Sequence, residues 1–331
     1  MSEGFRGLFG LSDSSNSGSD SEIGDSFMEN GEASDVIESN DGVLVHSSQD
    51  CDISINLKQN KMLGIAHQLW PAATYLCNYL ERQYLEREVH DGSKEVHDGS
   101  KEEYANILEL GAGIGLCGIY AHQLFQARQT IVTDLEDAMD IINENIELNR
   151  DQSSSLREIE AQVLSWGDMG HVTSIMDRFA DNSHTDTAST SLDGEIPPPL
   201  VLIADCVYWE NLFEPLVQTI RCLVLHYKCT VLMAYVKRWK KCSKFFQMLR
   251  KKDVTRDGHL TDLKYVDVEL MDENIVWEVD SFTKEDKKHI YRLYRIRGVT
   301  EEPDDTYFFR KRDSQKHDRI TDEEGTANKA P

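Results

Sequence analysis

The sequence lacks the features that mark several large classes of protein. Its 331 residues contain no run of 18 consecutive apolar residues, so we expect no membrane-spanning helix and no membrane partner. No apolar segment follows Met1, which argues against a secretory leader. The seven cysteines form no C-x-x-C pair and are odd in number, as expected for free thiols in a reducing compartment. We therefore expect a cytoplasmic location, with the nucleus as an alternative.

Basic residues are also scarce. The chain has 35 Lys and Arg against 59 Asp and Glu, which gives a formal net charge of −24. Because so acidic a protein repels phosphate backbones, we expect no nucleic-acid partner. The charge balance fits a basic partner or a cationic side chain better.

Polar, low-complexity segments flank and interrupt the part of the chain that can build a core. Residues 1–52 are rich in Ser, Gly, Asp and Glu, with Arg6 as their only arginine or lysine, which predicts a disordered acidic tail. Flexible inserts are expected at about 86–103, where the sequence EVHDGSK is repeated, and at 178–199. Residues 300–331 are expected to form a polar C-terminal tail. The segment between the tails, 53–299, is expected to be one domain with these two inserts.

Strand and helix patterns alternate through this domain. Short apolar runs indicate strands, and apolar residues at helical spacing indicate helices between them. The predicted strands are residues 106–110, 130–133, 161–164, 200–204, 230–236, 264–270 and 290–296, and the predicted helices are residues 116–126, 137–149, 212–225 and 243–251. This order predicts a Rossmann-like α/β sheet that is mostly parallel, with an antiparallel edge strand and helices on both faces.

The strongest functional signal is the segment ILELGAGIG, which begins in the first predicted strand of the domain. Gly111, Gly113 and Gly115 allow a sharp turn and a close approach of a ligand to the backbone. Glu109 precedes them, where it can accept a hydrogen bond from a cationic amino group or position water. Asp134 ends the next strand, where it can accept hydrogen bonds from the hydroxyls of an adenosine ribose. The G-x-G-x-G spacing with these two acids favours an S-adenosylmethionine enzyme over a dinucleotide enzyme, and the missing G-K-[ST] excludes a P-loop.

Two further strand ends carry candidate ligand contacts. Trp166 in VLSWGD follows the third predicted strand, where its indole can stack on adenine, although a tryptophan there more often belongs to the core. Asp205 and Tyr208 follow the fourth strand, and side chains beyond the carboxyl ends of parallel strands can reach a bound substrate. A capping Asp in an ordinary strand-to-helix turn is the alternative explanation.

These motifs resemble a known family. ELGAGIG, VTD, LSWGD and ADCVY, with LWPAATYLCNYLE upstream, are similar to the seven-strand protein methyltransferases of methyltransferase family 16, over residues 63–297 apart from the inserts. The resemblance implies a class I methyltransferase sheet, S-adenosylmethionine as the cofactor, and methyl transfer to a lysine of a specific non-histone protein. The runs TDLEDAMDIINENIELN and ADCVYWENLFEPLVQTI look most like the member that methylates the valosin-containing AAA ATPase, which implies an AAA ATPase or a chaperone as the partner.

The resemblance also implies roles for individual residues. Asp205 and Tyr208 match the Asp-x-x-Tyr pair associated with the acceptor lysine. Pro71 departs from the family, whose members often carry Asp after the tryptophan. The residues that match cofactor contacts are Trp70, Gly111, Ala112, Gly113, Asp134, Trp166 and Ala204, and the spacing of the glycine motif adds Glu109 and Gly115.

Two other functions stay open on the sequence. A small-molecule methyltransferase would share the cofactor motifs, but it usually needs a lid over the pocket, and no strong apolar helical candidate lies upstream. A catalytically silent scaffold would bind the cofactor and use the acidic tail to hold a basic partner. Methylation of a base or a glutamine is disfavoured, because DCVY lacks the prolines of the [ND]-P-P-[YF] motif. The His-Asp pairs of the repeat could bind a metal, but nothing else in the sequence supports a metal site.

Overall fold

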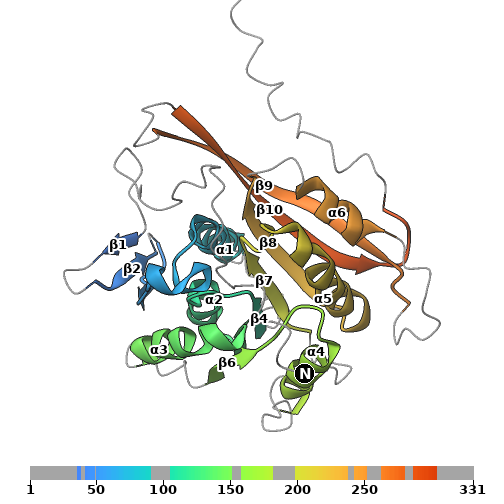
Figure 1. Ribbon diagram of the computed structural model, residues 1–331, viewed down its shortest axis with the longest axis horizontal. Helices are drawn as coiled ribbons and strands as arrows, with labels where there is room; N and C mark the ends of the chain where they lie inside the picture. Colours follow the sequence, from blue (N-terminus) through green and yellow to red (C-terminus); the bar gives the residue numbers. More distant parts are fainter. Residues whose placement is uncertain are drawn as a thin grey trace, which may run out of the picture.

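The structure, a computed structural model shown in Figure 1, describes residues 36–38, 42–48, 50–90, 105–150, 158–181, 198–237, 242–251, 262–279 and 286–303. Its centre is a twisted sheet with helices packed on both faces (Figure 1). Within these ranges no helix is both long enough and apolar enough to cross a bilayer.

The central sheet has seven strands in the order β6-β5-β4-β7-β8-β10-β9. The first five strands in this order are parallel, and β10 pairs antiparallel with both β8 and β9. The bounds are β4 (Asn106–Leu110), β5 (Gln129–Asp134), β6 (Ile159–Val163), β7 (Leu200–Ala204), β8 (Thr230–Val236), β9 (Tyr265–Val279) and β10 (Asp286–Val299). The mostly parallel sheet with an antiparallel edge is therefore confirmed. The chain order reverses between β4 and β7, which is where open α/β sheets bind ligands.

Two apolar clusters join the helices to the sheet because side chains of a strand alternate between its faces. On β4, Ile107 belongs to the cluster that includes helices α1 (Pro71–His90), α2 (Leu116–Phe125) and α3 (Met139–Arg150). Leu108 and Leu110 belong to the cluster that includes α4 (Met169–Asp181), α5 (Phe213–His226) and α6 (Cys242–Arg250). Figure 1 shows these two sets of helices on opposite sides of the sheet.

Helices α1 and α4 were not among the helices predicted from the sequence. In α4, buried Val172, Ile175, Met176 and Phe179 have the spacing i, i+3, i+4, i+7, so the sequence does carry the signal. Helix α1 begins at Pro71, where proline is favoured because the first helical N–H needs no partner within the helix. The departure from the family at Pro71 therefore agrees with a helix start at this position.

A second, three-stranded antiparallel sheet packs beside α3. It consists of β1 (Val36–Glu38), β2 (Leu44–Ser47) and β3 (Ser54–Leu57). Asn149 of α3 accepts a hydrogen bond from the Asn56 amide (2.9 Å) and donates one to its carbonyl (2.8 Å). Strands β1 and β2 lie within the stretch for which the sequence predicts a disordered tail. That prediction is therefore wrong for residues 36–38 and 44–47, where a brief strand such as LVHS is too small to stand out from its polar surroundings.

The predicted inserts and C-terminal tail are only partly described. Helix α1 continues to His90 and α4 to Asp181, so the first residues of both expected inserts are helical. The remainder of the inserts, residues 91–104 and 182–197, lies outside the described residues, as do 1–35 and 304–331.

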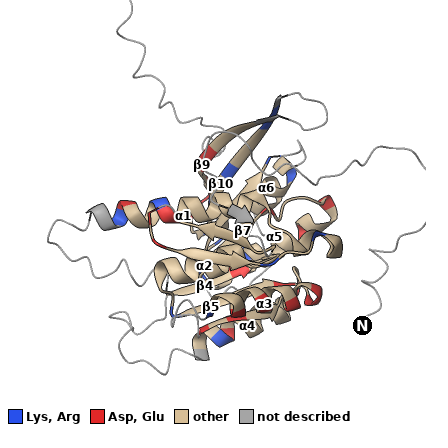
Figure 2. Cartoon of the chain, turned by 90° about the vertical axis from the view of Figure 1, so that its left-hand side faces the viewer, with Lys and Arg blue, Asp and Glu red and all other residues tan. Residues whose placement is uncertain are grey.

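The hairpin of β9 and β10 reaches beyond the rest of the sheet (Figures 1 and 2). Pairing between β8 and β10 ends at Val236 and Tyr291, so residues 286–290 continue past the carboxyl end of β8. On β9, the paired residues Ile275 and Trp277 are exposed. Residues 286–290 thus lie at the edge of the sheet that holds the carboxyl ends of the parallel strands.

Candidate active site

The glycine segment forms a tight loop between β4 and α2. Gly111, Gly113 and Gly115 have φ angles of 62°, 58° and 87°, a left-handed conformation that strains residues with a side chain. The Ala112 amide donates to the Thr133 carbonyl of β5 (3.0 Å), which ties the loop to the neighbouring strand. A Cβ at Gly111 would lie 2.6 Å from Cys206 Sγ and 2.7 Å from Trp166 Cζ2. The Gly111 backbone therefore packs directly against Trp166 and Cys206, at the switch between β4 and β7.

Asp134, the last residue of β5, is bound to this loop. Its Oδ2 accepts the Gly113 amide (2.8 Å), and its Oδ1 accepts the Leu135 amide (2.7 Å). Burial raises the pKa of Asp134 to about 6, and the two amide hydrogen bonds oppose that rise. At neutral pH the carboxylate is ionised. Since each oxygen retains a second lone pair, it can still accept hydroxyl groups of a ligand.

Glu109 lies beneath the loop. It is 2% exposed, and its Oε2 accepts the Gly118 amide in the first turn of α2 (2.7 Å). Burial raises the pKa of Glu109 to about 8, opposed by that amide, so its protonated form predominates at neutral pH. The partner that the structure gives Glu109 is thus a backbone amide, and the contact with a cationic amino group expected from the sequence stays a prediction.

Trp166 and Cys206 meet at Gly111, as the two short distances to its Cβ position indicate. Trp166 follows β6 and is half-buried against the cluster on the α5 side. Cys206 Sγ lies 3.5 Å from the Leu110 carbonyl oxygen and 3.6 Å from that of Gly111. Burial raises the pKa of the Cys206 thiol well above its usual range, so the thiol stays protonated and can donate to these carbonyls. The sequence argument did not single out Cys206, because a lone buried cysteine in an apolar run carries no functional signal.

Asp205 occupies the turn that follows β7 and is 6% exposed. Its φ angle is 57°, which an Asp tolerates better than most residues, and such strain is common at functional sites. The Asp205 amide donates to the Ala234 carbonyl of β8 (2.8 Å), and Oδ1 lies 3.4 Å from the Val236 amide. Two contacts to β8 thus fix both the backbone and the carboxylate of Asp205.

Tyr208 is half-buried and lies three residues after Asp205 in the chain. Its ring packs edge-on against Trp209, with 5.3 Å between the centroids. The pKa of Tyr208 is raised, first by burial and then by Cys206, Asp134 and Asp205. The phenol therefore stays neutral. It lies close enough to the carboxyl groups of Asp134 and Asp205 for both to raise its pKa.

The upstream segment crosses over the glycine loop. Trp70 Nε1 donates to the Ile65 carbonyl (2.8 Å), which holds the 3₁₀ turn η3 (Ile65–His67) against the start of α1. The Ala66 carbonyl oxygen lies 3.3 Å from where a Cβ of Gly113 would be. Trp70 thus belongs to a segment that lies against the loop, its contact with the cofactor stays a prediction, and Ala204 ends β7 immediately before Asp205.

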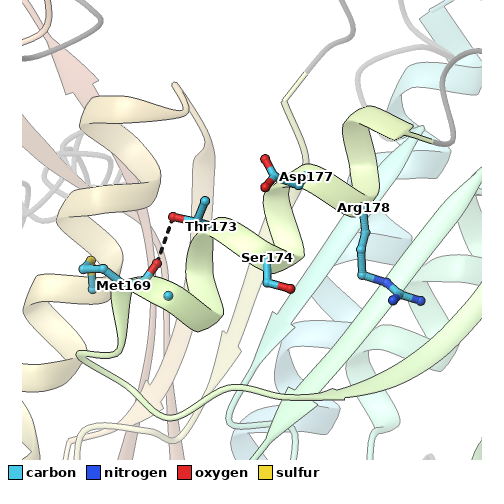
Figure 3. A pocket seen from close by; sticks show the side chains of 6 residues that line it. Met169, Thr173, Ser174, Asp177 and Arg178 are labelled. Carbon is cyan, nitrogen blue, oxygen red and sulfur yellow. Dashed lines mark hydrogen bonds between the residues drawn. The ribbon is translucent and has the colours of Figure 1, made fainter.

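A hollow on α4 lies apart from these residues (Figure 3). Its wall is one face of the helix, with Met169, Thr173, Asp177 and Arg178. The Thr173 hydroxyl donates to the Met169 carbonyl (2.9 Å), and Arg178 is paired with Glu160. None of the residues predicted from the sequence lines it, so we assign it no role in the site.

The site brings most of the predicted residues to one edge of the sheet. The glycine loop and Asp134 meet through the Gly113 amide, and Asp205 is held beside them through Cys206. The tight glycine loop, in which Gly111 has no room for a Cβ, and the ionised Asp134 fit S-adenosylmethionine, which needs a close backbone approach and an acceptor for ribose hydroxyls.

A family model described as lysine methyltransferase matches residues 49–252, which is more than half of the chain. Among curated proteins, Protein N-lysine methyltransferase METTL21A of Xenopus tropicalis is 28% identical over 60% of this chain and 73% of its own length. Protein-lysine N-methyltransferase EFM6 of Saccharomyces cerevisiae is 30% identical over 57% of this chain and 70% of its own length. EEF1A lysine methyltransferase 3 of Mus musculus is 31% identical over 52% of this chain and 57% of its own length.

Among solved structures, TYW2 of M. jannaschii in complex with AdoMet aligns with 82% of this chain and 90% of its own, at 12% identity and a TM-score of 0.34. Precorrin-6y C5,15-methyltransferase of Geobacter metallireducens aligns with 60% of this chain and 83% of its own, at 13% identity and a TM-score of 0.34. Likeness at this level has no bearing on function. The family match does bear on function. The chain belongs to the lysine methyltransferase family, and S-adenosylmethionine is its cofactor.

Proposed function

We propose that this enzyme methylates the side-chain amine of a lysine in a specific non-histone protein, at Asp205 and Tyr208. The observation that carries the proposal is the contact of Cys206 with the Leu110 and Gly111 carbonyls. It holds the Asp-x-x-Tyr turn directly against the glycine loop, so that a group bound at Asp205 lies beside a cofactor bound at Gly111.

The cofactor is proposed to lie on the bare backbone of Gly111 and Gly113, with Asp134 accepting from its ribose and Trp166 flanking its adenine. Trp70, Ala112, Gly115 and Ala204 complete this proposed site, in which Glu109 supports the loop from below. When bound there, S-adenosylmethionine supplies an electrophilic methyl group on a sulfonium.

The acceptor amine must be neutral before it can act as a nucleophile. Lysine in water has a pKa of about 10.4, so a proton has to leave the ammonium group first. We propose that Asp205, fixed by β8, orients the amine and takes this proton through water, and that burial of the lysine lowers its pKa. Tyr208, whose raised pKa keeps it neutral, forms the wall of the lysine channel, where its hydroxyl can accept a hydrogen bond from the acceptor ammonium group.

An AAA ATPase or a chaperone is the proposed acceptor protein. The resemblance of two sequence runs to the enzyme of the valosin-containing AAA ATPase favours an AAA ATPase or a chaperone. EEF1A appears in the names of two relatives and is the second candidate. We also propose a cytoplasmic location, with the nucleus as the alternative, because all seven cysteines are free thiols in the structure. Fractionation of cells that express the tagged chain tests the location.

The test is transfer of labelled methyl groups into a cell extract. Wild-type protein is compared with Asp134→Ala, which removes the ribose acceptor, and with Asp177→Asn on α4 as a control. We expect a labelled protein band whose label maps to lysine, is lost with Asp134→Ala and is kept with Asp177→Asn. Label confined to small metabolites would replace the proposal with a small-molecule enzyme. Cofactor binding without transfer in extracts from several cell types would favour a scaffold.

A further inference from the structure

A second cavity lies beside the proposed cofactor site. It has a volume of about 470 Å³, and its wall includes Lys58 and Leu63 on one side and Asp137, Asp140 and Glu144 on the other. The first group belongs to the segment between β3 and α1, and the second to the turn η5 (Glu136–Ala138) and α3. None of the site residues predicted from the sequence lines this cavity.

The rim of the cavity is apolar and unusually exposed. Met62, on the turn η2 (Lys61–Leu63), is 93% exposed, and Leu63 beside it is 64% exposed. Ile65 on the adjoining turn η3 is exposed as well. Since large apolar side chains gathered at one exposed place mark contact sites for other molecules, this rim indicates a docking surface.

The opposite wall is acidic. Asp137, Asp140 and Glu144 are exposed along one side of η5 and α3, three or four residues apart, and Figure 2 shows acidic residues along α3. Lys58 pairs with Glu144 (2.5 Å), and in the described part of the chain no ion pair neutralises Asp137 or Asp140. The wall therefore attracts a cation.

A buried histidine in the same wall supplies an independent indication of a ligand. His67 is 8% exposed and lines the cavity, and its Nε2 lies 3.2 Å from the Asp137 carbonyl oxygen. Since a carbonyl only accepts, Nε2 donates to it, and a ring that carries one proton then has a lone pair at Nδ1. Among the described residues, Nδ1 has no hydrogen-bond partner. A buried acceptor without a partner is costly unless a donor reaches it, and the ammonium or guanidinium of a basic side chain is such a donor.

The cavity shares its wall with the cofactor site. His67 and Ala66 belong to the same turn, and the Ala66 carbonyl borders Gly113. The charge of Asp137, which lines the cavity, contributes to the raised pKa of Asp134. A chain segment bound in the cavity is therefore held close to the edge of the sheet at which transfer is proposed.

From this geometry we infer that the cavity and its rim bind a basic segment of the substrate protein, away from the acceptor lysine itself. Lysine or arginine side chains of the segment enter the acidic cavity, and an apolar side chain packs on Met62 and Leu63. This inference rests on the proposed function, because it describes how a protein substrate is selected for that reaction.

A binding experiment separates the inference from catalysis. The probe is a fluorescent peptide of alternating Lys and Leu, with a fully lysine-acetylated copy as its control. Binding is measured for the full chain, for D140N/E144Q, for M62S/L63S, and for D177N, which removes an equally exposed acid from α4 on the other face of the sheet. The substitutions are on the surface, and Asp134 is left unchanged.

We expect D140N/E144Q to bind the peptide about 3- to 30-fold more weakly, on the scale of two exposed charge pairs, and D177N to bind it normally. M62S/L63S should also bind it more weakly, because the apolar contact surface is removed. Hydrogen exchange with bound peptide should protect residues 58–67 and 137–146. The inference would be overturned if D177N weakened binding equally, or if both double variants bound the peptide normally. It would also be overturned if the peptide protected only residues outside 58–67 and 137–146 from exchange, or if the acetylated peptide bound. Failure of the proposed function has a different signature, namely normal peptide binding with no label on any protein lysine.

Discussion

Replacement of Gly111 by alanine tests how tightly the loop is enclosed. The new Cβ would lie 2.6 Å from Cys206 Sγ and 2.7 Å from Trp166 Cζ2, about an ångström inside normal contact. Cys206 is buried in the turn after β7 and cannot move without disturbing Asp205. The backbone adds a second cost, since φ at this position is 62°.

The expected loss of stability has two separable parts. The left-handed conformation costs a residue with a side chain about 1–2 kcal/mol. Overpacking against fixed neighbours costs about 1–3 kcal/mol, so the total is about 2–5 kcal/mol. Gly42→Ala is the matched control, because Gly42 has a φ of 75° but nothing within 4 Å of its Cβ position. It should therefore lose only the backbone part.

Urea denaturation gives the free energy of unfolding, and calorimetry gives the affinity for S-adenosylmethionine. We expect Gly111→Ala to be less stable than Gly42→Ala by about 1–3 kcal/mol and to bind the cofactor more weakly. Adding Cys206→Ala to Gly111→Ala removes one of the two clashes and should restore part of the stability. The description of the loop would be refuted if Gly111→Ala were as stable as Gly42→Ala and bound the cofactor normally.

Three further predictions concern titratable groups of the site. Tyr208→Phe should lower kcat about 10- to 100-fold, the worth of one hydrogen bond to a charged group, and leave cofactor affinity unchanged in calorimetry; an unaltered kcat would remove Tyr208 from the mechanism. Affinity for S-adenosylmethionine should fall as the pH drops through about 6, because protonated Asp134 loses acceptor capacity; a flat profile between pH 5 and 8 would contradict its proposed role. For Glu109, the pKa rises from 4.5 to about 8 on folding, so its contribution to stability is complete below pH 4.5 and is lost as the pH rises through 8. Glu109→Gln should therefore gain stability relative to wild type between pH 5 and 9, by up to about 5 kcal/mol in urea denaturation, and equal pH profiles would disprove the shift.

The sequence predicted the parts of the site that lie at the ends of neighbouring parallel strands. Gly111 and Asp134 each follow an apolar strand, and parallel strands bring such ends to one edge, so their proximity could be inferred before the structure was known. The mostly parallel sheet with an antiparallel edge was predicted from the same alternation of strands and helices. Helix α4 was missed although its spacing is regular, and β2 was missed because four residues carry too little pattern.

Contacts between distant segments could not be predicted. Cys206 touches Gly111 only because β7 lies next to β4, and nothing in DCVY indicates where its thiol points. The partner of Glu109 is likewise set by tertiary packing, since a carboxylate on a strand could face the ligand or, as here, the adjacent helix. The cavity at His67 depends on a 3₁₀ turn whose sequence resembles an ordinary loop.

The central claim is that Asp205, held by β8 beside the glycine loop, activates the acceptor lysine. The most direct measurement is single-turnover methyl transfer by Asp205→Asn to the protein acceptor, with S-adenosylmethionine affinity determined on the same sample. A positioned acid or base contributes about 10²- to 10⁴-fold, so we expect transfer to slow by that factor while cofactor affinity stays within about twofold. Transfer at the wild-type rate would contradict the claim, and so would a loss of transfer explained entirely by lost cofactor binding.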